Sequence, residues 1–194
     1  MRCEPVRLLD LSPYTILVFV FLLSLYSGAS GQSTFKGFSV NPKFGAYSQF
    51  KENQGFTGGI EFNRFNGNTI YSVDYFLFGE FSLMDPVPND VFNQIGFMIG
   101  RYTGNKYFRI EYQGGLAPFF GKIRTESLSG TPGTPSYRYY EEDKFFTLGL
   151  AVKLGFKIVP LKQISLGIDV QTNLNLKQPV FFPCLSLEIG RLKN

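Results

Sequence analysis

Residues 163–176 read QISLGIDVQTNLNL and carry an apolar side chain at almost every second position. Polar or small residues stand between them, so the stretch has a period of two. This period predicts a β-strand with one apolar face and one polar face. The direction of the apolar face then decides the fold, because a soluble barrel buries that face whereas a membrane barrel exposes it to lipid.

The composition of the whole chain favours the membrane alternative. The protein has 194 residues, a length typical of a single domain. Only 18% of its residues are charged, against about 25% in soluble domains, while 22 Phe and 11 Tyr bring the aromatic content to 17%. So few charges would cover a soluble surface poorly.

The chain lacks the residues on which several kinds of active site depend. It contains no histidine, which excludes a Ser-His-Asp triad, a Cys-His pair and histidine-ligated metal sites. Its two cysteines are Cys3 and Cys184, and the first falls in a segment predicted to be removed, so no intrachain disulfide is expected. No cofactor, no metal site and no nucleic-acid partner is expected, because there is no ligand set and no long basic run.

Residues 1–31 are predicted to form a cleaved signal peptide. Residues 16–26, ILVFVFLLSLY, are apolar apart from one serine, and small residues follow them up to Gly31. This apolar stretch is too short for a helix that spans a bilayer but has the length of a signal-peptide core. A short membrane anchor or a buried helix is the alternative. Residues 32–194 are then the mature barrel domain.

Short alternating segments follow one another from Gln32 to the C-terminus, and none shows a sustained helical period. They predict eight strands, at residues 37–49, 56–65, 69–83, 92–102, 107–118, 145–158, 164–174 and 181–192. Tight turns at 66–68, 103–106 and 160–163 alternate with longer connections at 50–55, 84–91, 119–144 and 175–180. This pattern predicts an all-β fold, an eight-stranded antiparallel up-and-down transmembrane β-barrel.

The predicted interior face is polar, because the apolar face carries too much bulk for the narrow interior of an eight-stranded barrel. Small residues dominate the polar face, and ionisable residues of both signs lie among them. Buried charges must pair, so these residues are predicted to form a structural interior network: Glu61, Asp74, Arg109, Glu111, Lys153, Asp169 and Glu188. A proton or ion path through the barrel is the functional alternative.

Aromatic residues gather near both ends of the predicted strands, as the two interfacial girdles of a membrane barrel require. Those beside the longer connections are Phe50, Phe56, Phe81, Phe92, Phe119, Phe120, Phe145, Phe146, Phe181 and Phe182, and those beside the tight turns are Tyr71, Tyr102, Tyr107 and Phe156. Four basic residues at the turn end are expected to meet lipid headgroups or solvent: Arg64, Arg101, Lys157 and Arg191.

Two features interrupt this pattern. Pro42 lies within the first predicted strand, where a closed barrel has no free edge, so a bulge or a later strand start is expected. Residues 75–78, YFLF, place two phenylalanines on the polar face.

The sequence resembles the small outer-membrane β-barrel family of the Bacteroidota, the porin-family or PorT-type proteins, and more distantly the OmpX-like barrels. The resemblance lies in a leader that ends in ASG, in the strand sequences FTLGLAVKLGF and ISLGIDVQTNLNL, and in the last segment NLKQPVFFPCLSLEIGRL. It implies an outer-membrane location with both termini in the periplasm, and it supplies no functional residues. The chain ends in Leu192-Lys193-Asn194 where a terminal aromatic residue would be expected.

The function predicted from these features is that of a non-enzymatic outer-membrane barrel that presents extracellular loops or supports an envelope assembly. Its partners would be outer-membrane lipid and, through the 119–144 loop, envelope proteins or an extracellular ligand. The candidate binding residues in this loop are Tyr137, Arg138, Tyr139 and Tyr140, since Tyr and Arg are enriched in binding hot spots.

Two other functions stay open at this point. The first is a soluble secreted lipocalin-like carrier, in which the apolar face would line a cavity for an apolar ligand. The second is a membrane-embedded enzyme that modifies lipids, which would need a catalytic base other than histidine.

Overall fold

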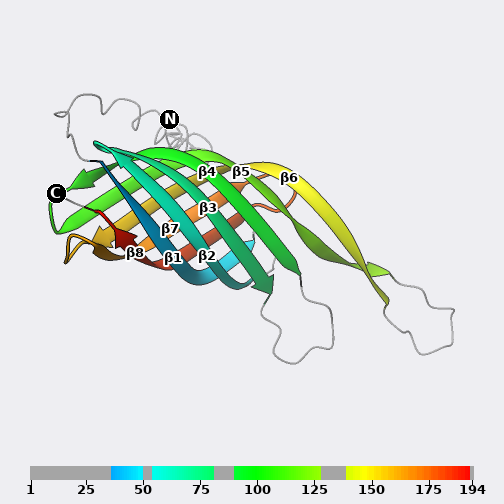
Figure 1. The fold of residues 1–194 in the computed structure, drawn as a ribbon. Helices are drawn as coiled ribbons and strands as arrows, with labels where there is room; N and C mark the ends of the chain where they lie inside the picture. Colours follow the sequence, from blue (N-terminus) through cyan, green and yellow to red (C-terminus); the bar gives the residue numbers. More distant parts are fainter. Residues whose placement is uncertain (1–35, 50–53, 81–89, 128–138, 193–194) are drawn as a thin grey trace, which may run out of the picture. The chain divides into compact units, whose positions relative to one another are not determined.

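The computed structural model describes residues 36–49, 54–80, 90–127 and 139–192, and within them the chain forms eight strands (Figure 1). These are β1 (Lys36–Gln49), β2 (Gln54–Asn66), β3 (Thr69–Glu80), β4 (Val91–Gly104), β5 (Phe108–Ser127), β6 (Tyr139–Ile158), β7 (Ile164–Leu174) and β8 (Val180–Gly190). No helix among the described residues is long and apolar enough to cross a membrane. The predicted signal peptide lies outside the described residues.

Each strand pairs in antiparallel fashion with the next one along the chain, and β8 pairs with β1 to close the barrel (Figure 1). The predicted all-β, eight-stranded, up-and-down barrel is therefore confirmed. Because the barrel is closed, no sheet edge remains along the paired length of its wall. The backbone N–H and C=O groups there are hydrogen-bonded between strands and need no solvent.

The two ends of the barrel differ in their connections. At one end, here called the turn end, β2 and β3 are joined through Gly67, whose φ of 60° suits a two-residue hairpin turn. The β4–β5 turn is closed by Asn105, whose Oδ1 accepts hydrogen bonds of 2.9 Å from the backbone N–H groups of Tyr107 and Phe108. The opposite end, here called the loop end, carries the connections at 50–53, 81–90, 128–138 and 175–179.

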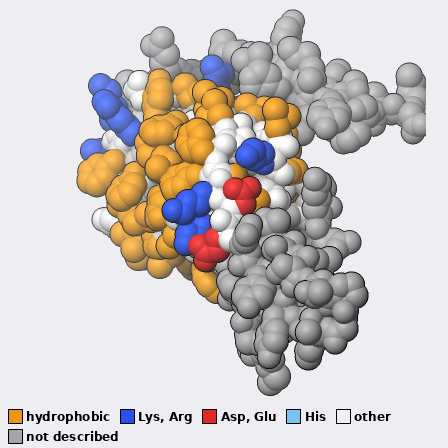
Figure 2. All heavy atoms as spheres, turned by 90° about the vertical axis from the view of Figure 1, so that its right-hand side faces the viewer, with side chains coloured by type: hydrophobic (Ala, Val, Ile, Leu, Met, Phe, Trp, Pro, Cys, Tyr) orange, Lys and Arg blue, Asp and Glu red, His pale blue; other side chains and the backbone are white. Residues whose placement is uncertain are grey.

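Alternate side chains of each strand point to opposite sides of the wall, and β3 shows this clearly. Tyr71, Val73 and Leu77 are between 45% and 50% exposed on the outside, whereas Asp74 and Phe76 are buried inside. The outward residues of the other strands are likewise mostly large and apolar, and such side chains cover most of the described surface in Figure 2. The apolar face therefore points outward.

Three strands contain a proline, and each proline interrupts one ladder without shifting its register. Pairing between β1 and β8 stops after Val40 and resumes at Lys43 in the same register, so Pro42 stands in an unshifted strand. Pro183 lies in the second interruption of this ladder, and Pro118 interrupts the β4–β5 ladder in the same way. The predicted bulge or late strand start at Pro42 is wrong, because the missing N–H costs only local pairs on one side of the strand.

The hairpin of β5 and β6 extends beyond the rest of the barrel at the loop end (Figure 1). Pairing between these strands continues to Ser127 and Tyr139, whereas β4 accompanies β5 only as far as Lys122 and β7 accompanies β6 only from Leu150. Much of the predicted 119–144 loop is therefore strand. We call residues 123–127 and 139–143 the hairpin extension.

Candidate functional site

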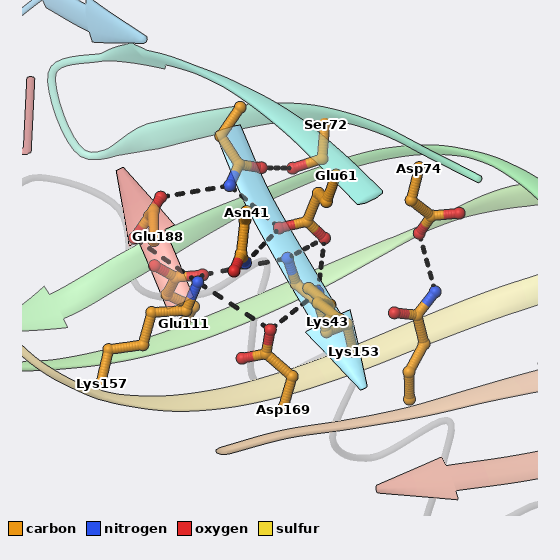
Figure 3. Close-up of polar contacts among 12 residues, drawn as sticks. Asn41, Lys43, Glu61, Ser72, Asp74, Glu111, Lys153, Lys157, Asp169 and Glu188 are labelled. Atoms are coloured by element: carbon orange, nitrogen blue, oxygen red, sulfur yellow. Dashed lines mark hydrogen bonds and ion pairs between the residues drawn. The ribbon is translucent and has the colours of Figure 1, made fainter. Parts of the chain in front are cut away.

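The polar interior of the barrel contains a cluster of buried ionisable side chains, and Figure 3 shows all of them except Arg109. They come from seven of the eight strands and are all less than 5% exposed. Four are cations and five are carboxylates, and together we call them the interior charge cluster: Lys43, Arg109, Lys153, Lys157, Glu61, Asp74, Glu111, Asp169 and Glu188. All seven residues predicted for the interior network belong to it.

Glu61 on β2 lies at the centre of one half of the cluster. Its carboxylate accepts hydrogen bonds from Lys43 Nζ on β1 at 2.8 Å and from Lys153 Nζ on β6 at 2.7 Å (Figure 3). The amide groups of Asn41 and Asn63 donate to its other oxygen at 3.2 Å and 2.9 Å. One carboxylate therefore connects strands on opposite sides of the barrel interior.

Glu188 on β8 has the same role in the other half. It forms an ion pair with Arg109 on β5 and a weaker one, at 3.5 Å, with Lys157 on β6. The hydroxyl of Ser39 donates to its Oε1 at 2.5 Å. Arg109 also lies 2.7 Å from the carboxylate of Glu111 on the same strand. Through Ser39, Arg109 and Lys157, Glu188 joins β1, β5 and β6 to β8.

Asp169 on β7 connects the two halves. Its Oδ2 lies 2.7 Å from Lys43 Nζ and 3.9 Å from Lys157 Nζ. Gly155 stands opposite it on β6, and a Cβ at that glycine would approach Oδ1 of Asp169 to 2.6 Å. The small residue therefore leaves room for the carboxylate inside a narrow barrel.

Asp74 on β3 differs from the other carboxylates in its partners. Among the described residues no cation lies within 4.0 Å of it, and its hydrogen bonds come from the amides of Gln171, at 2.8 Å, and Gln94, at 3.3 Å. Its cross-strand neighbours are Glu61 on β2 and Gly96 on β4. A Cβ at Gly96 would collide with the carboxylate of Asp74, so glycine is needed here too.

Apolar side chains close the barrel interior on both sides of the charge cluster. Towards the loop end lies a group of buried rings, here called the aromatic plug: Tyr47, Phe76, Phe78, Phe92, Phe119, Phe145 and Phe182. Phe78 is its centre, with ring centroids of Phe182 at 5.1 Å and of Phe119 at 5.7 Å. Towards the turn end a smaller group contains Phe65, Ile70, Val159 and Leu192, and the Arg109 guanidinium lies 5.0 Å from the Phe65 ring centroid.

The aromatic plug corrects the prediction of a girdle at the loop end. Phe92, Phe119, Phe145 and Phe182 point into the barrel, whereas Phe56, Phe146 and Phe181 are between 42% and 67% exposed on the outside. Adjacent phenylalanines such as 181 and 182 must point to opposite sides of the wall. Phe76 and Phe78, which interrupt the polar face in the sequence, belong to the plug. Phe50 and Phe81 lie outside the described residues.

At the turn end, Tyr71, Tyr107 and Phe156 are 44% to 57% exposed and face outward, as predicted, whereas Tyr102 packs against the interior residue Phe65. Lys157 was expected to reach headgroups or solvent there, but it is fully buried in the charge cluster.

Two members of the interior charge cluster, Lys157 and Lys43, were not predicted to lie inside the barrel. The sequence contains a signal for Lys157. Lys157 follows Lys153 and Gly155 at a spacing of two, so the period of β6 already places it inside. Lys43 is harder to assign, because the neighbouring Pro42 obscures where the strand begins.

The candidate binding residues of the 119–144 segment are only partly described. Tyr137 and Arg138 lie outside the described residues. Tyr139 and Tyr140 begin β6, where their backbones pair with Ser127 and Glu126 of β5. Nearer the barrel, Lys122 and Glu142 form an exposed ion pair of 2.6 Å. The hydrogen bond and charge of the Lys122 ammonium hold the pKa of the Glu142 carboxyl below its usual range.

The buried cations and carboxylates of the interior neutralise one another. A buried carboxylate or ammonium is costly unless ion pairs and hydrogen bonds replace its water, and the cluster supplies both over several strands. Within the described part of the chain no group of three or more His, Cys, Asp or Glu side chains is arranged to hold a metal ion. The described interior charges are therefore arranged in pairs and hydrogen-bonded networks that link the strands.

No family model matches the sequence, and no curated protein sequence does so either. The structure is similar to three solved outer-membrane proteins. These are neisserial surface protein A (TM-score 0.56, 14% identity, 84% of this chain and 100% of that one), the N-terminal β-barrel domain of Pseudomonas aeruginosa OprF (0.54, 11%, 79% and 96%) and the attachment invasion locus protein Ail of Yersinia pestis (0.54, 10%, 81% and 99%). At such low identity the likeness concerns the fold, and the chain has the fold of a small eight-stranded outer-membrane β-barrel.

Proposed function

We propose that this protein is an integral outer-membrane barrel without enzymatic activity, which holds the β5–β6 hairpin extension on the outside of the cell. The apolar outer wall carries this proposal. Its large side chains are about half exposed on every strand, among them Phe44 at 61%, Phe97 at 55% and Leu185 at 66%. Soluble proteins rarely expose apolar surface so continuously, whereas lipid would cover it at no cost.

The filled interior supports a structural role for the barrel. Ion pairs occupy its middle and apolar side chains close it towards both ends. A lipocalin-like carrier is less supported, because the apolar face points away from the interior that would have to hold the ligand. The interior charge cluster would then fix the strands relative to one another, as the sequence predicts.

The hairpin extension supports a role in contact with a partner at the loop end. Among the described residues the β6 edge from Tyr139 to Gly149 has no partner strand on the β7 side, so its backbone groups are available for pairing. Such an edge can accept an extended segment of another envelope protein. The side chains of Lys122, Glu142, Asp143 and Lys144 are exposed and carry charges of both signs.

One neighbour suggests a comparison for ligands. Ail has been solved in complex with the heparin analogue sucrose octasulfate (TM-score 0.52, 11% identity). The balanced charges of this chain near its hairpin extension do not favour a polysulfate, so we propose a protein segment as its partner.

The remaining parts of the proposal come from the sequence. They are export by a signal peptide at residues 1–31, membership of the PorT-type barrels of the Bacteroidota, and a periplasmic location of the turn end. Tyr137, Arg138, Tyr139 and Tyr140 would be the contact residues.

Labelling of intact cells tests the orientation. Lys122→Cys at the loop end and Lys106→Cys at the turn end each replace an exposed lysine with a thiol. A membrane-impermeant maleimide should modify the first variant in intact cells and the second only after lysis. The native Cys184 is buried and serves as the unlabelled background. Labelling of Lys106→Cys alone in intact cells would reverse the proposed orientation, and labelling of both would exclude a membrane-spanning barrel.

A further inference from the structure

Among the described residues, the exposed charged side chains at the turn end are all basic. Six of them encircle the barrel there, and we call them the basic rim: Lys36, Arg64, Arg101, Lys106, Lys162 and Arg191. Within the described ranges no exposed carboxylate lies at this end. The loop end is different, because exposed Glu142 and Asp143 accompany its cations, and side chains of both signs lie close together in Figure 2.

Backbone hydrogen bonds and strand register fix the positions of the residues that form the basic rim. The backbone N–H of Leu192 donates to the carbonyl of Lys162, and that of Arg191 donates to the carbonyl of Phe38. The β1–β2 register places Arg64 opposite Phe38, and the β3–β4 register places Arg101 opposite Thr69. The rim therefore occupies a fixed level around the barrel.

Arg64 shows that this level is where the apolar wall ends. Its cross-strand neighbours are Phe38 on β1 and Tyr71 on β3, which are 71% and 46% exposed on the same outward face. Lys106 lies over the ring of the exposed Tyr107, with Nζ 4.9 Å from the centroid. Cations beside outward aromatic rings stand at the depth of lipid headgroups, since such rings prefer the membrane interface.

We propose that the basic rim binds the phosphate groups of anionic phospholipids in the leaflet that surrounds the turn end. This inference rests on the proposed function, because it requires the barrel to lie in a bilayer. The ligand follows from position and charge: the cations project from the outer wall, beside the lipid-facing rings. Each cation near an anionic surface contributes about a fivefold gain in affinity, and the gain falls in salt.

A matched pair of triple variants tests the inference. The first, Arg64→Gln, Arg101→Gln and Lys162→Gln, removes three charges from the basic rim. The second, Lys122→Gln, Lys144→Gln and Lys177→Gln, removes three exposed charges from the loop end. The protein, isolated from membranes of expressing cells, is incorporated into phosphatidylcholine vesicles that contain spin-labelled phosphatidylglycerol or spin-labelled phosphatidylcholine. Electron spin resonance then measures how much of each label is immobilised at the protein.

The unmodified protein should immobilise phosphatidylglycerol severalfold more than phosphatidylcholine at low salt, and about 1 M salt should abolish the preference. The rim variant should lose most of this preference, whereas the loop-end variant should keep it. Equal immobilisation of both labels, a preference that survives high salt, or equal losses in the two variants would overturn the inference. Immobilisation of neither label would instead overturn the proposed function, since the barrel would not be in the bilayer.

Discussion

Glu61 illustrates how single residues hold this barrel together. Its carboxylate pairs with Lys43 of β1 and Lys153 of β6, which are 0% exposed, so three strands depend on one charge. Removal of one partner from a buried ion pair is expensive, because the remaining charges have no water to replace it.

We predict that Glu61→Gln lowers the free energy of unfolding by about 3 kcal/mol, because two buried ammonium groups lose their shared carboxylate. Urea unfolding in lipid vesicles, followed by the gel mobility of the folded and unfolded forms, would measure this. The matched control is Glu142→Gln, which breaks the exposed pair with Lys122 and should change stability little. Equal effects of the two substitutions would contradict a structural role for the interior charge cluster.

The sequence predicts the side of the wall on which a residue lies better than it predicts which residues that side chain contacts. The period of two assigns a side of the wall to any residue in a regular strand, and this places Asp169 and Glu188 inside. It does not reveal which partner each charge meets, because Glu61 and Lys153 are far apart in the chain and meet only across the closed barrel.

Strand β7 shows how alternate residues of one strand contribute to the apolar outer wall and to the charged interior. Ile168 is 51% exposed on the outer wall, and its neighbour Asp169 belongs to the interior charge cluster. The sequence shows this alternation directly, whereas the direction of the apolar face follows only from side-chain bulk and the low charge content.

Ile168→Arg should destabilise the folded barrel by about 2 to 4 kcal/mol, since it places a charge on the lipid-facing wall near its middle. The control is Leu161→Arg, at a residue that is 55% exposed but lies in the β6–β7 turn, where water accepts the guanidinium. Unfolding midpoints in urea would compare the two. A barrel that tolerates both substitutions equally would not have its wall in lipid.

The aromatic plug arises from several strands and was only partly predictable. Phe76 and Phe78 interrupt the polar face of β3 in the sequence, but the rings that surround them come from β1, β4, β5, β6 and β8. In a pair of adjacent phenylalanines near a strand end, one ring faces outward and the other faces the interior. Such pairs therefore predict an outer aromatic girdle and a buried aromatic plug equally well.

Phe78→Ala should cost about 3 to 5 kcal/mol in unfolding free energy, because it leaves a cavity in the buried plug. Phe146→Ala removes the same ring from the outer wall, where it is 67% exposed, and should cost clearly less. The same urea titration serves both variants. A loss for Phe78→Ala no larger than that for Phe146→Ala would contradict a special contribution of the aromatic plug to stability.

The whole molecule combines an apolar outer wall with an interior that its own side chains fill. The fold could be predicted almost completely, because strand length, turn residues and alternation are local signals. The extra length of β5 and β6 could not, since the polar and Gly-Pro-rich segment at 125–144 reads as a loop, although its flanks pair as strands.

Because the interior is closed in this way, the barrel should not conduct ions steadily. Planar-bilayer recordings of the reconstituted protein should show no stable single-channel steps at moderate voltage. Defined open-channel steps would show that a water path crosses the charge cluster and the aromatic plug.

The central claim is that the apolar face of the barrel lies in lipid, and fractionation of cell membranes tests it most directly. After an alkaline wash the protein should stay with the membrane fraction, and its unheated and heated forms should differ in gel mobility. Release of the protein into the wash, or a soluble folded form in the absence of detergent, would contradict the claim.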